Sequence, residues 1–129
     1  MSYYLNTKLH TSFEQAVQLV TEALKIEGFG VLTEINIHEK LKEKLDVDFR
    51  RYIILGACNP AYAYKALQEE DKIGTMLPCN VIIQELAKNE IEVAAVDPVA
   101  SMLAIENLNL KGIAGEIQKK LKAVIDKLN

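Results

Sequence analysis

The sequence predicts one α+β domain spanning residues 1–129, with helices packed on a mixed, partly antiparallel sheet of about five strands. Three patterns predict this class. Apolar residues alternate at period two over residues 3–9, recur at helical spacing over residues 12–27 and 113–128, and form two strand-like runs joined by Ala-Lys-Asn-Glu at 87–90. The expected element order is β-α-β-α-β-α-β-β-α-α.

The first strand, residues 3–9, is followed by a helix. Thr11 and Glu14 have the spacing of a capping box, which satisfies free backbone N–H groups at a helix start. The helical spacing of apolar residues continues from there until Gly28, a residue type that commonly ends helices. We therefore expect a helix over about 12–27.

A second strand and a short helix follow. Residues 31–35 alternate and are rich in β-branched side chains, which favours a strand. Asn36 is a suitable N-cap for a helix with one apolar face formed by Ile37, Leu41 and Leu45.

Residues 51–58 are the best candidate for the middle of the sheet. The unbroken apolar run over residues 52–55 is typical of a strand that is covered on both faces. Asn59 and Pro60 then match the N-cap and first helical position, which predicts a helix over 60–69.

The rest of the chain completes the sheet and its helical cover. The loop over 70–80 carries Ile73, Met76 and Leu77, so we expect it to pack against the body of the domain. Residues 81–86 and 91–96 predict a β-hairpin. Asp97 and Pro98 then begin a short helix to about residue 106, and an amphipathic helix starts near Ile113.

Composition excludes several classes of partner. The net charge of −3 provides no general attraction to nucleic acid or anionic lipid. No apolar run approaches the roughly 18 residues of a membrane span, and the first ten residues do not resemble a secretion signal. We therefore expect a cytoplasmic protein that binds neither nucleic acid nor membranes.

Two cysteines are the candidate catalytic residues. Cys58 immediately precedes the N-cap of a predicted helix, where the helix dipole favours a thiolate, although small apolar cysteines are also common core residues. Cys79 opens the next strand. The thiols share one sheet edge if the two strands are antiparallel, and lie ~20 Å apart if they are parallel. The long connection between them favours the antiparallel return.

Polar side chains accompany both thiols. Asn59 and Asn80 each offer hydrogen-bond donors and an acceptor, so the two turns could hold a small polar or anionic ligand, or each asparagine could serve only its own turn. No metal-ligand spacing joins the cysteines to His10, His38 or Glu34, so we predict no metal site. The sequence identifies no cofactor.

Four strings resemble one known family. Residues 28–35, 55–67, 73–83 and 93–102 are similar, in order and spacing, to the bacterial and archaeal family catalogued as domain of unknown function 302. The resemblance implies a compact α+β fold, often a homodimer, and no agreed activity. It carries over these motif residues: Glu34, Gly56, Cys58, Asn59, Pro60, Gly74, Leu77, Pro78, Cys79 and Asn80.

Three functions are compatible with these observations, and the sequence does not decide whether the protein is an enzyme. The first is binding of a small polar or anionic ligand at the two turns, through Glu34, Cys58, Asn59, Pro60, Pro78, Cys79 and Asn80. The second is a thiol-dependent enzyme or redox protein that uses Cys58. The third is a homodimeric interaction module without catalysis.

Overall fold

The computed structural model describes residues 2–128 and confirms the α+β class. Five strands form one sheet in the order β1-β5-β4-β3-β2. They are β1 (Tyr4–Leu9), β2 (Gly30–Asn36), β3 (Tyr52–Cys58), β4 (Cys79–Ala87) and β5 (Glu90–Val96). Every neighbouring pair is antiparallel, so the sheet is antiparallel throughout rather than mixed.

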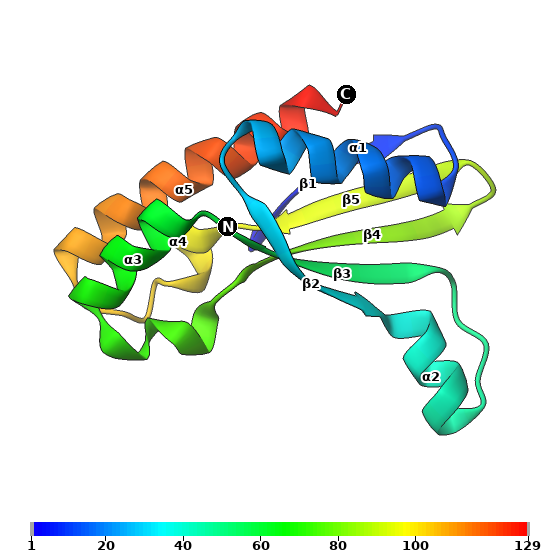
Figure 1. Cartoon of the computed structure of the whole chain (residues 1–129), viewed down its shortest axis with the longest axis horizontal. Helices are drawn as coiled ribbons and strands as arrows, with labels where there is room; N and C mark the ends of the chain where they lie inside the picture. Colours follow the sequence, from blue (N-terminus) through cyan, green and yellow to red (C-terminus); the bar gives the residue numbers. More distant parts are fainter. Residues whose placement is uncertain (1, 129) are drawn as a thin grey trace.

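Two long helices cover one face of this sheet. They are α1 (Phe13–Ile26) and α5 (Leu108–Lys127), which lie side by side over the strands in Figure 1. The shorter elements are α2 (Ile37–Leu45), α3 (Pro60–Glu69), a 3-10 helix (Asp71–Met76) and α4 (Pro98–Ser101). The main core lies between the covered face and the long helices, where Leu24, Leu55 and Leu121 are completely buried.

Within residues 2–128, no helix packs against the opposite face of the sheet, as Figure 1 shows. Tyr52 and Ile54 of β3 lie on this face and are half-buried, although the apolar run over residues 52–55 predicts a strand covered on both faces. The chain's own helices bury only Ile53 and Leu55 of that run. In Figure 1, α2 projects away from the body beyond the sheet, and none of its residues is buried.

The predicted loop over 70–80 does pack against the body. Its 3-10 helix places Ile73 in a second buried cluster with Ala66, Met102, Leu110 and Ala114. Met76, in contrast, remains exposed.

Several helix ends differ from the sequence-based expectation. Ser12, rather than Thr11, caps α1, because its hydroxyl accepts a hydrogen bond from the Gln15 amide at 3.1 Å. The last helix begins at Leu108, since Asn107 caps it, and α4 ends at Ser101 rather than near 106. Across residues 2–128, no helix combines the length and apolar character needed to cross a membrane.

Candidate functional site

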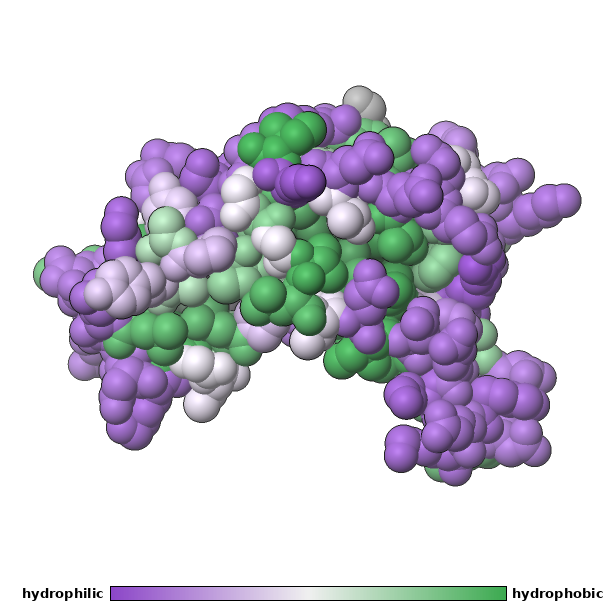
Figure 2. Space-filling model, viewed as in Figure 1, coloured by the Kyte–Doolittle hydropathy of each residue, from purple (hydrophilic) through white to green (hydrophobic). Residues whose placement is uncertain are grey.

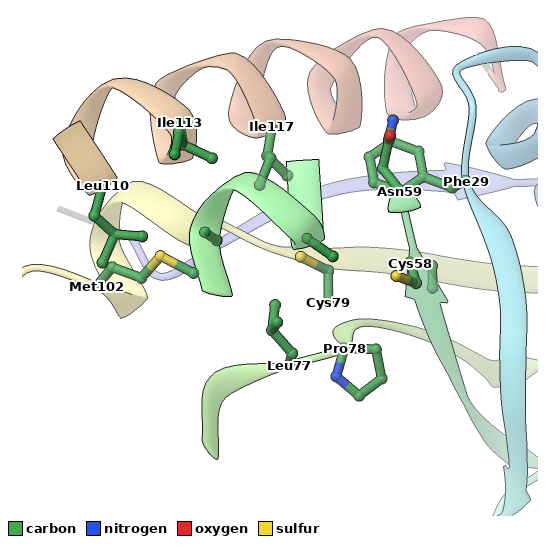
Figure 3. A pocket seen from close by; sticks show the side chains of 13 residues that line it. Phe29, Cys58, Asn59, Leu77, Pro78, Cys79, Met102, Leu110, Ile113 and Ile117 are labelled. Carbon is green, nitrogen blue, oxygen red and sulfur yellow. The ribbon is translucent and has the colours of Figure 1, made fainter. Parts of the chain in front are cut away.

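The two cysteine-bearing turns meet at one end of the sheet. Strands β3 and β4 are antiparallel with Ala57 paired to Cys79, which confirms the predicted antiparallel return. Cys58 and Cys79 both line one small cavity, and Figure 3 shows both side chains beside it. Its volume is about 20 Å³, enough for about one water molecule.

The walls of this cavity are apolar. Besides the cysteines, they consist of Phe29, Ala57, Asn59, Ala63, Ala66, Leu77, Pro78, Met102, Leu110, Ile113 and Ile117. Among the described residues that line it, none carries a charge. A cavity of this size and composition is unsuited to a polar or anionic metabolite, because such a ligand would lose its hydration without gaining polar partners.

The two thiols differ in accessibility. Cys79 is only 6% exposed, whereas Cys58 is half-buried. Burial, and to a smaller extent the neighbouring Cys58, raises the pKa of the Cys79 thiol from 9.0 to about 11. Cys79 is therefore protonated at neutral pH, and of the two side chains Cys58 is the one that solvent molecules reach.

Asn59 has a structural contact that its position in the sequence did not predict. It occupies the N-cap position of α3, but its side chain makes no capping hydrogen bond there. Instead its Nδ2 donates to the backbone oxygen of Glu27 at 3.3 Å. Gly28, whose φ is +88°, allows this approach, because a Cβ there would lie 3.0 Å from Asn59 Nδ2. Asn59 thus joins the end of α1 to the start of α3.

Gly56 allows the turn that contains Pro78 to lie close to β2. A Cβ at Gly56 would overlap Thr33 Oγ1 and would lie 2.8 Å from Cγ of Pro78. Pro78 follows a cis peptide bond and lines the cysteine cavity. Glycine at this position therefore lets β2, β3 and the Pro78 turn pack together.

The predicted site residues do not all converge. Cys58, Asn59, Pro78 and Cys79 line the cysteine cavity. Asn80 lies on the opposite, uncovered face of the sheet. Pro60 is exposed at the start of α3, and Glu34 is exposed on the edge strand β2. Neither residue lines the cysteine cavity or the groove on the uncovered face.

A broad groove of about 390 Å³ lies on the uncovered face. It is lined by Tyr3, Tyr4, Tyr52, Asn80, Ile82, Gln84, Glu92, Ala94, Ala95 and Val96. Figure 2 shows the molecule hollowed on the side of the sheet away from α1 and α5. Sequence reasoning found only Asn80 of these residues, although the alternation along residues 80–84 could have indicated that this face of β4 is distinct.

Hydrogen bonds organise one end of the groove. Glu92 accepts from Asn6 Nδ2 at 2.9 Å through one carboxylate oxygen and from Gln84 Nε2 at 2.7 Å through the other. Gln84 Oε1 in turn accepts from Arg50 Nε at 2.7 Å. We call these four residues the polar network. Because both oxygens of Glu92 already have a donor, the network holds the side chains in place.

The remainder of the groove is apolar and aromatic. Cross-strand pairing aligns four side chains on the uncovered face, Ile35, Ile54, Ile82 and Ala94, which we call the apolar row. Tyr3 and Tyr4 lie at the rim with ring centroids 5.0 Å apart in an edge-to-face arrangement, and Tyr3 is 72% exposed. The groove therefore combines an apolar floor with aromatic walls.

Metal binding has no visible basis in the part of the chain that the structure describes. Within residues 2–128, no three His, Cys, Asp or Glu side chains are grouped so that they could hold an ion.

Comparisons with known proteins agree with this fold. The family model described as "Domain of unknown function DUF302" matches residues 5–128. The crystal structure of an uncharacterized conserved DUF302 protein from Bacillus stearothermophilus is 30% identical, with a TM-score of 0.92 and complete coverage of both chains. No match was found among curated proteins. Since the family model spans nearly the whole sequence, this chain belongs to the DUF302 family.

Proposed function

We propose that this protein is a binding domain whose ligand site is the groove on the uncovered face of the sheet. The observation that supports this proposal is a hollow of about 390 Å³ on a face that no helix covers. Sites for small molecules usually measure roughly 300–1,000 Å³ and combine apolar walls with a few polar groups. The cysteine cavity, at about 20 Å³, is far below that range.

The lining favours an uncharged molecule with a flat apolar part. Ile82 and Ala94 provide an apolar floor, and the rings of Tyr3 and Tyr4 offer aromatic surface for stacking. Asn80 and the tyrosine hydroxyls are the groups suited to orient a ligand by hydrogen bonds. Among the described residues that line the groove, Glu92 carries the one charge, and that charge is negative. This is a reason to prefer a neutral ligand to the anion that the sequence suggested.

The proposal is tested by binding of Nile red, a neutral aromatic dye, and of a library of uncharged aromatic fragments. Tyr3→Ala removes a rim side chain that is 72% exposed, and Tyr64→Ala on α3 is a matched control at 66%. Losing one stacking contact of roughly 1 kcal/mol weakens binding about fivefold, while the control binds as the parent does.

A second variant fills the groove instead of trimming it. Ala94→Phe places a ring over the floor, so it should abolish binding while thermal unfolding remains cooperative. Fragments that bind both tyrosine variants and Ala94→Phe as tightly as the parent would show that the groove is not their site.

A second candidate function is self-association through the same face, as the family resemblance suggests. The five strands are about 4.8 Å apart and roughly 23 Å long, which gives roughly 550 Å² per copy. Two such faces bury about 1,100 Å², just above the roughly 1,000 Å² that specific interfaces need. The apolar row supplies the apolar centre of such an interface.

Sedimentation velocity over a range of concentrations separates the two candidates. Ile35→Lys places a charge in the apolar row without changing a groove residue. The control is Ile26→Lys, because Ile26 is also exposed but belongs to α1, on the other side of the sheet. If two copies pair through this face, Ile35→Lys sediments as a monomer at concentrations where Ile26→Lys and the parent are dimers. Identical sedimentation of all three proteins would exclude pairing through this face.

A further inference from the structure

We propose that two copies of this chain exchange arms, so that the arm of each copy packs against one corner of the other copy's uncovered face. The arm is residues 37–50, which comprise α2 and the segment that returns the chain to β3. The corner is formed by Tyr3 and Tyr4, and we call it the tyrosine corner. This inference rests on the second candidate function, self-association through the uncovered face, and adds the two surfaces that meet.

The arm stands clear of its own chain. In Figure 1, α2 lies on the opposite side of the strands from α1 and α5, and none of its residues is buried. It has nine residues, whereas isolated helices shorter than about 12–15 residues are marginal in water and depend on packing for their stability. A second chain packed against the arm would supply that stabilisation.

Contacts at the base and end of α2 hold the arm in position. The backbone N–H of Tyr52 donates to His38 Nδ1 at 3.0 Å, which joins the start of α2 to β3. Lys42 pairs with Asp46 at 3.0 Å and with Asp48 at 3.4 Å, which joins α2 to the returning segment. The arm therefore presents a formed surface to a partner.

The returning segment carries apolar side chains that continue the uncovered face. Val47 and Phe49 alternate with charged residues and remain 43% and 41% exposed. The ring centroid of Phe49 lies 6.2 Å from that of Tyr52, which lines the groove. Apolar surface is thus continuous from the groove onto the arm.

The tyrosine corner offers the matching surface, and it lies diagonally across the sheet from the arm. The arm leaves the sheet at the end of β2, whereas Tyr3 and Tyr4 lie at the opposite edge and the opposite end, where β1 starts. These two side chains are 72% and 40% exposed. The far end of β1 instead carries Lys8 paired with Glu92, and the corner where β2 starts is distorted by a register shift. Apolar side chains of an arm therefore favour the tyrosine corner.

Twofold symmetry brings each arm to this corner. A twofold interface makes each contact twice, because residue i meets residue j and j meets i. The uncovered face is about 24 Å wide and roughly 23 Å long, so it is nearly square. Two such faces overlap well when their strands cross near a right angle, which is one of the two common sheet packings. With the twofold axis along the other diagonal, that crossing places each arm over the partner's tyrosine corner.

The arm is long enough for this contact. The nine residues of α2 span about 14 Å, whereas two packed sheets lie ~10 Å apart. The arm can therefore pass the plane of the partner's sheet and reach the outer edge of β1. A hollow of about 350 Å³ lies there, with Tyr4, Leu5 and Ile125 in its lining.

Arm exchange brings the buried area to that of a typical dimer. A helix of this length covers roughly 14 by 10 Å, so each arm buries roughly 140 Å² of its own surface and as much of the partner's. Two arms add roughly 560 Å² to the roughly 1,100 Å² of the paired faces. The total of about 1,650 Å² matches the roughly 1,600 Å² of a standard specific interface.

Sedimentation velocity of the full chain tests the contact with one variant on each side of it. Val47→Lys charges the arm, Tyr3→Glu charges the tyrosine corner, and Ile26→Lys is the control, because Ile26 is 69% exposed on α1. Each contact occurs twice, so Val47→Lys and Tyr3→Glu should each raise the dissociation constant of the dimer at least about tenfold. The control should dimerise as the parent does. Cooperative thermal unfolding of each variant shows that it folds.

Mixing the two variants tests whether the two side chains meet across the dimer. A heterodimer of Val47→Lys and Tyr3→Glu keeps one original contact and pairs the new lysine with the new glutamate at the other. The mixture should therefore dimerise at concentrations where each variant alone is monomeric. Native mass spectrometry should find one chain of each kind in these dimers. A mixture that stays monomeric overturns the inference.

Failure of the arm contact is distinguishable from failure of pairing itself. If Ile35→Lys is monomeric while Val47→Lys and Tyr3→Glu sediment as the parent does, two copies pair through the face without exchanging arms, and the inference is overturned. A parent protein that is monomeric at every concentration overturns both the pairing and the arm exchange. Binding of Nile red is measured separately, so the ligand site is judged on its own result.

Discussion

Replacing Gly56 with alanine should destabilise the protein, even though alanine is normally the better strand residue. A glycine within a strand costs roughly 0.5–1 kcal/mol relative to alanine, so a Gly→Ala change in open space should stabilise. At Gly56 the added methyl group would overlap Thr33 Oγ1 and lie 2.8 Å from Pro78 Cγ. Packing an extra methyl group into a filled site costs typically 1–3 kcal/mol.

Because the methyl group would meet both Thr33 and Pro78, the packing cost lies near the upper end of that range, about 3 kcal/mol. Subtracting the roughly 0.5–1 kcal/mol gained from alanine leaves an expected loss of about 2 kcal/mol of unfolding free energy for Gly56→Ala. For a domain of this size, that corresponds to a decrease in Tm of roughly 8 °C. Gly30→Ala is the matched control, because Gly30 also lies in a strand and a methyl group there meets no atom within 4 Å. It should leave stability unchanged or raise it slightly.

Urea unfolding followed by circular dichroism measures both variants, and a third variant identifies the contact responsible. Thr33→Ala removes the hydroxyl that the new methyl group would overlap, so it should restore about 1 kcal/mol in the Gly56→Ala background. The contact with Pro78 would remain. The steric reasoning is refuted if Gly56→Ala unfolds at the same urea concentration as Gly30→Ala.

Three further predictions concern buried groups. Because the Cys79 pKa is higher in the folded chain than its ordinary 9.0, the unfolded chain loses this proton first, and stability should fall by about 2 kcal/mol between pH 9 and 11. Cys79→Ala should flatten that pH profile in urea titrations. Asp97 caps α4 and accepts both Gln118 hydrogen bonds at 3.0 Å, so Asp97→Ala should cost about 2–3 kcal/mol in urea unfolding, and Asp97→Asn less. Leu121→Ala in the core should cost about 2–5 kcal/mol by calorimetry, against under about 0.5 for exposed Leu45→Ala.

Most of the fold could be predicted from the sequence. The strongest periodic patterns of apolar residues belong to the helices and strands that pack on one core. The helix over 12–27, the hairpin and the antiparallel return from β3 to β4 were all predicted. The predicted helix boundaries were wrong where a single polar side chain determines the end of the helix. Asn107 begins the last helix well before Ile113, and the spacing of apolar residues did not reveal this cap.

The candidate site was harder to predict, because local patterns do not report tertiary contacts. Asn59 has the sequence position of a capping residue, yet its side-chain amide donates to the backbone oxygen of Glu27, just after the end of α1. Asn80 directly follows Cys79, but neighbouring strand residues point to opposite faces, so it belongs to a different surface. The polar network joins residues from 6 to 92, a set that only the order of the strands brings together.

Packing within the chain does not explain why the apolar run in β3 is unbroken. An antiparallel sheet with one face in water normally alternates apolar and polar residues. Here the helices cover Ile53 and Leu55, yet Ile54 continues an apolar row with Ile35 and Ile82 on the other face. Burying the apolar surface that these residues expose would favour association. Isoleucines at these positions are what the proposed binding or self-association at this face requires, because either would cover the apolar row from outside the chain.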